Sequence, residues 1–302
     1  MARGDVPARV PGVCLADHTL IAVPTTAEKR RAFRQLHESG CFVIPNPWDA
    51  GTARYLQHLG FRALATTSSG AAFSMGLPDE DWALTRDPML AHIRVVVDAS
   101  DLPVNADFES GYADDPEDLA ENVRLCVRTG VAGLSIEDST GDPSRPLYSF
   151  DLAVARIRAA RADIDRAGED VLLVGRTEGF IAGVPDLDEA LRRLTAYAAA
   201  GADCLYAPGL RTREQIAAVV HAVAPKPVNL LIGGPIGLTV KDAADLGVRR
   251  ISVGGGLARA AWGGFIRAAR GLAAGTFDGF ADAASGADLN RLFAEDVRRR
   301  SR

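Results

Sequence analysis

From about residue 27 onward, short apolar runs alternate with longer amphipathic stretches. The runs begin near Cys41, Arg62, Leu102, Ala132, Val171, Asp203, Pro227 and Arg250. They are nearly continuous in their apolar character, which is typical of parallel strands buried on both faces. Eight strands, each followed by a helix, predict an α/β fold of the (β/α)8 TIM-barrel type with extra C-terminal helices. An open doubly wound sheet is the alternative, but its dinucleotide fingerprint is missing after the first strand.

Local signals mark the helix boundaries. Asp87-Pro88 and Asp115-Pro116 each predict an N-cap followed by proline at the first helical position. Thr212 and Gln215 match a capping box. One helix is expected over 188–200. Several helical stretches are followed by a glycine, where a left-handed residue ends a helix: Gly60, Gly130, Gly168, Gly201 and Gly247.

The chain divides into an arm and one domain. Residues 1–26 are rich in Pro, Gly and Ala without sustained periodicity, and predict a mobile N-terminal arm. Residues 27–302 predict a single (β/α)8 barrel domain, whose C-terminal helices are expected at 258–274 and 287–300.

Composition narrows the class of protein. The 302 residues are 47% hydrophobic and 24% charged, with a formal net charge of −5, so nothing points to a nucleic-acid partner. No apolar run is long enough to cross a membrane, and the N-terminus does not resemble a secretory signal. Four scattered cysteines without a CxxC motif predict a reduced, cytoplasmic protein. The five histidines lie in the arm or in predicted helices, which disfavours a zinc site.

Charged residues stand at the ends of three successive predicted strands. The segment Val104 to Tyr112 carries Asp107 and Glu109 at i and i+2, where side chains of an extended chain point the same way. Paired carboxylates of this kind suit Mg²⁺. The next strand ends in Glu137-Asp138. Since the carboxyl ends of barrel strands form the catalytic face, these residues predict an active site.

The following strand ends in Arg176, two residues before Glu178. An arginine at this place predicts a bidentate clamp for an anionic substrate, while a structural ion pair with Glu178 is the alternative.

Other strand ends carry neutral groups. Small hydroxyl residues around a glycine, in 66–72, offer backbone N–H groups to an anion, or simply form a tight turn. The glycine turns at 233–237 and 254–256 occupy the usual phosphate position of such barrels, but neither contains Lys or Arg, which disfavours phosphate. Asn229 is either a ligand-facing amide or a satisfied core group. Asp79, taken alone, is most simply a solvated loop residue.

Taken together and in order, these segments resemble the isocitrate lyase/phosphoenolpyruvate mutase superfamily, from about Glu28 through the C-terminal helices. The Val104 to Tyr112 segment resembles the metal strand of that family. The motifs ending in Asp79, Glu137-Asp138 and Arg176-Thr177-Glu178 match further family segments. The stretch from Phe180 to Asp203 is similar to the mutase branch.

The resemblance implies a Mg²⁺ enzyme, with Mn²⁺ as a substitute, that acts on a small carboxylate through a metal-stabilised, pyruvate-type enolate. It implies Asp107 as the direct metal ligand, with Asp79, Glu109 and Glu137 acting largely through waters. It also implies a substrate site at Thr67, Ser69, Gly70, Ala71, Asp107, Arg176 and Asn229. The resemblance further implies a homotetramer that exchanges C-terminal helices between subunits.

Three family features are missing from this chain. The loop 138–148 lacks the lyase cysteine and also the Lys and Asn of C–P enzymes, and Tyr206-Ala207 stands where mutases carry His-Ser. The leading hypothesis is therefore a Mg²⁺-dependent C–C lyase or decarboxylase, with Arg176 and Glu137 as catalytic residues and Arg145 or Tyr148 replacing the missing acid. A phosphonopyruvate hydrolase or mutase-like C–P enzyme, and a non-catalytic barrel that binds a 2-oxo acid, are the alternatives.

Overall fold

The computed structural model describes residues 23–80 and 82–300, so most of the predicted arm at 1–26 lies outside the described residues. Eight strands form one parallel sheet: β1 Phe42–Ile44, β2 Leu64–Ala65, β3 Val104–Asp107, β4 Gly133–Glu137, β5 Leu172–Arg176, β6 Cys204–Tyr206, β7 Val228–Leu231 and β8 Arg250–Ser252. The strand order is β1-β8-β7-β6-β5-β4-β3-β2. The amide of Ala65 donates to the carbonyl of Pro45 across the remaining gap, at 3.0 Å. The sheet is a nearly closed barrel, which confirms the predicted fold.

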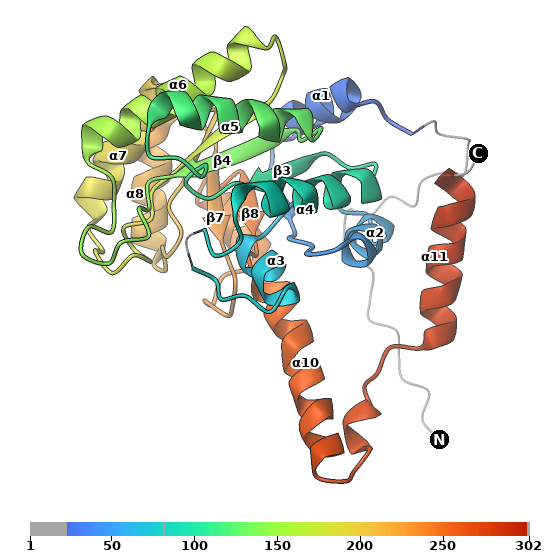
Figure 1. The fold of residues 1–302 in the computed structure, drawn as a ribbon. Helices are drawn as coiled ribbons and strands as arrows, with labels where there is room; N and C mark the ends of the chain where they lie inside the picture. The colour runs from blue at the N-terminus through green and yellow to red at the C-terminus, as the bar shows by residue number, and fades with distance from the viewer. Residues whose placement is uncertain (1–22, 81, 301–302) are drawn as a thin grey trace.

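Helices surround this barrel (Figure 1). They are α1 Thr26–Leu36, α2 Ala50–His58, α3 Ser68–Ser74, α4 Arg86–Ala99, α5 Pro116–Arg128, α6 Phe150–Arg166, α7 Leu187–Ala199, α8 Arg213–Val223, α9 Val240–Asp245, α10 Gly256–Ala273 and α11 Gly286–Arg300, with a short 3-10 turn, η1, at Asp278–Phe280. Every strand begins within two residues of its predicted start.

Most predicted helix ends are confirmed. Asp115 caps α5 with Pro116 in its first turn, and Thr212 and Gln215 form the capping box of α8. One prediction is wrong: α4 begins at Arg86 after Thr85, so Asp87 lies inside the helix and does not cap it. Proline is tolerated there because the first four N–H groups of a helix have no partner within it. Each of the five predicted glycines follows a helix and has a positive φ angle: Gly60, Gly130, Gly168, Gly201 and Gly247.

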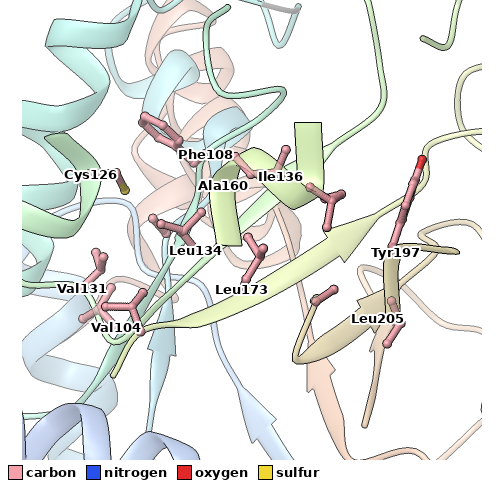
Figure 2. Packing of buried hydrophobic residues seen from close by; sticks show 14 of the residues in the cluster. Val104, Phe108, Cys126, Val131, Leu134, Ile136, Ala160, Leu173, Tyr197 and Leu205 are labelled. Carbon is pink, nitrogen blue, oxygen red and sulfur yellow. The ribbon is translucent and has the colours of Figure 1, made fainter. Parts of the chain in front are cut away.

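The largest apolar cluster lies between the sheet and its helices. Figure 2 shows Leu134 and Ile136 of β4 and Leu173 of β5 packed together in this layer. A second cluster joins Phe33 of α1 to residues near the amino ends of the strands, including Phe42 and Ala132. A Cβ on Gly133 would lie 2.8 Å from the Phe33 ring, so α1 closes the amino end of the barrel.

The C-terminal helices extend away from the barrel (Figure 1). On α10, the large side chains Trp262, Phe265 and Ile266 are exposed. On α11, Asp296 contacts Arg54 of α2 at 3.2 Å. Among the described residues, no helix is both long enough and apolar enough to span a membrane.

Candidate active site

Three adjacent strands place charged and aromatic residues side by side at their carboxyl ends. Glu137 of β4 is the register partner of Arg176 of β5, and Arg176 is in turn the partner of Tyr206 of β6. Register partners on parallel strands project from the same face of the sheet. The sheet therefore builds a row in which the guanidinium lies between a carboxylate and a phenol ring.

Arg176 is the centre of this row. Its Nη1 lies 3.0 Å from Asp107 Oδ1 and 3.1 Å from Glu137 Oε2, while its Nε donates to Glu178. Its carbon Cζ lies 5.0 Å from the centroid of the Tyr206 ring, within cation–π range. Four neighbours therefore hold the guanidinium. The side chain is 14% exposed, so it still reaches the surface of the barrel mouth.

Asp107 ends β3 and is held from two sides. Its Oδ2 accepts hydrogen bonds from the backbone N–H and the hydroxyl of Ser68, at 2.9 and 3.0 Å, and its Oδ1 faces Arg176. Its own N–H donates to the hydroxyl of Thr66 at 2.9 Å. The carboxylate is thus fixed between the ends of β2 and β5.

The neighbouring acids Glu137 and Asp138 point to opposite sides of β4, as consecutive strand residues must. Glu137 faces Arg176 in the mouth. Asp138 faces α7, where it accepts hydrogen bonds from Tyr197 and Arg193. Only one member of this pair belongs to the mouth.

The turn after β3 separates Glu109 from Asp107. The extended backbone ends at Asp107, and Glu109 and Tyr112 both have positive φ, at 48° and 58°. Such angles are uncommon for residues with a side chain, and they cluster where surrounding packing imposes them. Glu109 accepts from the N–H of Trp82 at 3.1 Å and from the Tyr112 hydroxyl at 2.8 Å. The i, i+2 geometry expected from the sequence does not hold in this turn.

The segment after β2 forms the short helix α3 and not an open loop. Thr67 is its N-cap, and the Thr67 hydroxyl lies 2.9 Å from that of Ser69. The amides of Gly70 and Ala71 are directed at the Thr67 hydroxyl and carbonyl. A Cβ on Gly70 would approach Trp48 to 2.9 Å, so glycine is required by packing there. The predicted carboxylate cradle thus lies at the mouth, with these two amides already engaged by the chain.

The remaining predicted neutral residue, Asn229, is buried inside the barrel. Its side-chain amide donates to Ser252 at 2.9 Å and its carbonyl oxygen accepts from Arg250 at 2.8 Å. Of the two readings of this residue, the contacts fit a satisfied core group. Asp79 lies in the exposed segment between α3 and α4.

The two candidate acids on the loop after β4 lie in different surroundings. The Tyr148 ring is buried under the guanidinium of Arg156, 4.2 Å from its centroid, and the Tyr148 hydroxyl donates to Asp114. Arg145 is exposed near the tip of this loop. The loop is pinned at its base by an antiparallel bridge between Ser139 and Leu147.

Burial and charge shift the proton affinities of the row. Burial alone would lower the pKa of Arg176, but Glu137 and Glu178 raise it well above its usual range. Burial raises the pKa of Glu178 to about 7 against the opposing effect of Arg176. Burial likewise raises the pKa of Tyr206 to about 12. Arg176 is therefore a permanent cation, whereas burial favours the protonated form of Glu178.

The oxygen donors at the mouth fit a hard divalent cation. Asp107 and Glu137 both face one nitrogen of Arg176, and the guanidinium together with its three ionised carboxylates carries a formal net charge of −2. Within residues 23–80 and 82–300, no three Asp, Glu, His or Cys side chains are grouped tightly enough to hold a metal alone. A cation with few protein ligands and several waters fits this arrangement, and Mg²⁺ is such a cation.

Sequence reasoning missed several residues that build the mouth. Ser68 holds Asp107, and Tyr206 faces the guanidinium of Arg176. Asn46 at the end of β1 accepts from the N–H groups of Val253 and Gly254, both at 2.9 Å, and donates to the Thr66 carbonyl. Their sequence signal was a place at or within three residues of a strand end, which many inert residues share.

This chain is similar to several known proteins. The phosphoenolpyruvate phosphomutase family matches residues 33–273. An oxaloacetate decarboxylase of Paraburkholderia xenovorans is 34% identical over 241 residues, covering 77% of this chain and 76% of the relative. A crystal structure of a proposed lyase/mutase from Burkholderia cenocepacia J2315 is 49% identical with a TM-score of 0.85, covering 89% of this chain and 96% of that one. The structure of 2,3-dimethylmalate lyase is 28% identical with a TM-score of 0.78, covering 92% and 97%.

The fold and the charged row thus define a barrel of the isocitrate lyase/phosphoenolpyruvate mutase superfamily, which confirms the resemblance seen in the sequence. Within it, the chain belongs to the phosphoenolpyruvate phosphomutase family.

Proposed function

We propose that this protein is a Mg²⁺-dependent carbon–carbon lyase or decarboxylase that acts on a small oxaloacetate-like or 2-hydroxy dicarboxylate. The observation that carries the proposal is the Arg176 guanidinium, held between Asp107, Glu137 and Glu178 at the barrel mouth. One fixed cation beside a surplus of carboxylates suits an anionic substrate bound together with a divalent ion.

In this proposal Asp107 would hold the ion directly, and Asp79, Glu109 and Glu137 would hold it largely through waters. Bound Mg²⁺ would supply Lewis-acid polarisation of a 2-oxo carbonyl. Arg176 binds the substrate carboxylate and stabilises the negative charge that develops as the neighbouring bond breaks. The start of α3, at Thr67, Ser69, Gly70 and Ala71, borders the substrate. Asn229, held in the core of the barrel, would support the substrate site from the barrel interior.

In this proposal the proton donor lies on the loop after β4. Arg145 is exposed there, whereas the Tyr148 hydroxyl is engaged by Asp114. We therefore propose Arg145 as the group that reaches substrate, and a supporting role for Tyr148. Separate Arg145→Ala and Tyr148→Phe variants test these two roles. Arg145→Ala should lower kcat, whereas Tyr148→Phe should chiefly change the conformation of the loop.

The test is Mg²⁺-dependent pyruvate release, coupled to lactate dehydrogenase. The substrates are oxaloacetate, 2-methylisocitrate, dimethylmalate and phosphonopyruvate, with isocitrate followed separately by glyoxylate release. Free metal ions also promote oxaloacetate decarboxylation, so Asp107→Ala at equal concentration and a sample with EDTA are the controls. EDTA-sensitive release from a carbon acid, lost in Asp107→Ala, supports the proposal. Full turnover by Asp107→Ala would contradict the metal role.

A C–P bond enzyme is the second candidate, because the family that matches the chain is named for phosphoenolpyruvate phosphomutase. Tyr206 at the end of β6 and the loop after β4 lack the groups expected for that chemistry. Phosphorus NMR of phosphonopyruvate separates the candidates, since only C–P chemistry changes that signal. Silence on every substrate, combined with Mg²⁺-dependent binding of oxalate, would instead indicate a binding barrel.

We also propose that the protein is a homotetramer whose C-terminal helices pack on neighbouring subunits. The exposed Trp262, Phe265 and Ile266 on α10 support an additional packing partner for that helix. Sedimentation equilibrium of the full chain tests this, and a monomer at micromolar concentration would refute it.

A further inference from the structure

Asp138 is the most completely engaged carboxylate at the ends of β4 and β5. Its side chain is 2% exposed. Its Oδ2 accepts from the Thr177 hydroxyl at 2.8 Å, from Arg193 Nη1 at 3.0 Å and from the Tyr197 hydroxyl at 2.6 Å, while its Oδ1 accepts from the Glu178 N–H at 2.8 Å. Both oxygens of the carboxylate are thus engaged, Oδ2 by three donors and Oδ1 by one.

These contacts link α7 to the residues that flank Arg176. Arg193 and Tyr197 come from α7, and Tyr197 packs on β5, where a Cβ on Gly175 would lie 3.0 Å from the Cβ of Tyr197. Thr177 and Glu178 directly follow Arg176, and the Glu178 carboxylate accepts from Arg176 Nε. Asp138 thus fixes the backbone and hydroxyl next to the guanidinium, without touching the guanidinium itself.

Asp138 also adjoins Glu137, which contacts Arg176 from the other face of β4. Asp138 therefore restrains two of the three acidic residues around Arg176. It restrains Glu137 as its neighbour in the chain and Glu178 through a hydrogen bond. The ion pair between Asp138 and buried Arg193 makes this restraint stronger than a neutral hydrogen bond would be.

We propose that Asp138 is the positioning residue of the site, which orients Arg176 for the substrate carboxylate through Thr177 and Glu178. The inference rests on the proposed role of Arg176 as the carboxylate clamp. A carboxylate accepts from all four donors, whereas an amide in its place would direct its own N–H₂ group at a donor.

The test compares Asp138→Asn with Asp163→Asn. Asp163 is a buried acid of α6 that pairs with Arg166 at 2.9 Å, and it therefore controls for the loss of a buried ion pair outside the mouth. For Asp138→Asn we expect KM for the active carboxylate, and the Kd of oxalate measured by calorimetry with Mg²⁺, to rise about 10- to 100-fold, as for other groups that support ligands. Asp163→Asn should leave both constants within twofold while lowering the melting temperature.

Thr177→Val and Tyr197→Phe each remove one donor and keep the side-chain shape. They keep the inference testable if Asp138→Asn does not fold, and each should produce a smaller rise in the same two constants. Equal constants in these variants and in the wild type would overturn the inference.

Crystal structures of the wild type and of Tyr197→Phe and Asp138→Asn separate this inference from the proposed function. We expect the contact of Arg176 Nη1 with Asp107, 3.0 Å in the wild type, to lengthen in the variants. An unmoved Arg176 would refute the positioning role. If the wild type neither turns over any substrate nor binds oxalate, the proposed function fails, and the movement of Arg176 still decides the role of Asp138.

Discussion

The two ends of the barrel bury polar groups in different ways. At the carboxyl end, Arg176 is surrounded by Asp107, Glu137 and Glu178 and stays in contact with solvent. At the amino end, Phe33 of α1 fills the opening and His37 packs against it, with ring centroids 4.6 Å apart. The first end accumulates charge that packing alone would not favour, while the second is arranged as apolar core.

Charged groups at the amino end lie both on α1, where Arg30 pairs with Glu169, and in the barrel interior. Arg250 is buried there, and its guanidinium donates to the side-chain carbonyls of Asn229 and Asn105 at 2.8 and 3.2 Å. In the described part of the chain, no carboxylate forms an ion pair with Arg250. Under the proposed function, we expect substitutions at the amino end to change stability and substitutions at the carboxyl end to change activity.

The largest expected effect is on stability, at the amino end. Phe33→Ala deletes a fully buried ring and should lower the free energy of unfolding by about 3–5 kcal/mol, because the cavity cannot collapse completely. Urea denaturation measures this change. The kcat of the folded variant should match that of the wild type. A selective loss of kcat would contradict the assignment of stability to the amino end and activity to the carboxyl end.

The second effect is on activity, at the carboxyl end. Arg176→Lys keeps a positive charge but loses the planar fork that contacts Asp107 and Glu178 at once. We expect kcat/KM to fall by about 10²–10³-fold, the size found when one stabilising donor is lost. Steady-state kinetics on the substrate found in the panel would measure this, and a change below threefold would remove Arg176 from the site.

The third effect is the acid sensitivity of the amino end. Burial, together with the nearby Arg250, lowers the pKa of His37 to about 3. Since the folded pKa lies below the unfolded value, the neutral imidazole contributes stability that is present above pH 6.5 and is lost as the pH falls toward 3. The loss approaches about 1.4 kcal/mol per pH unit. Unfolding experiments between pH 7 and 4 should show a shallower loss for His37→Gln than for the wild type; parallel curves would contradict this account.

The smallest effect is the opposite pH dependence of the carboxyl end. Burial raises the pKa of Glu178 to about 7, so its stabilising contribution is full below the unfolded pKa and is lost as the pH rises through 7. That pKa already contains the opposing effect of Arg176, which pairs with the ionised form. Glu178→Gln should remove the decline between pH 5 and 7.5 in unfolding experiments. A steeper decline in the variant would show that the ion pair outweighs burial.

The order of elements was predictable because its signals are local. Proline at the start of α5, the capping box of α8 and the glycines that end helices each act within one turn, and continuous apolar runs identify parallel strands. Parallel strands in a barrel also carry their carboxyl ends to one face, so Asp107, Glu137 and Arg176 could be assembled from sequence. Their proposed roles toward metal and substrate stay predictions.

What only the tertiary structure decided is where individual side chains point after the strands end. Leu119 of α5 packs so closely on the turn after β3 that a Cβ on Gly111 would lie 2.1 Å away, and the adjoining Glu109 takes a left-handed conformation. Asn229 and Tyr148 are likewise engaged by residues from other elements, Arg250 and Asp114. Such conformations depend on contacts between segments distant in sequence, whereas strand and helix order follow from patterns that neighbouring residues carry themselves.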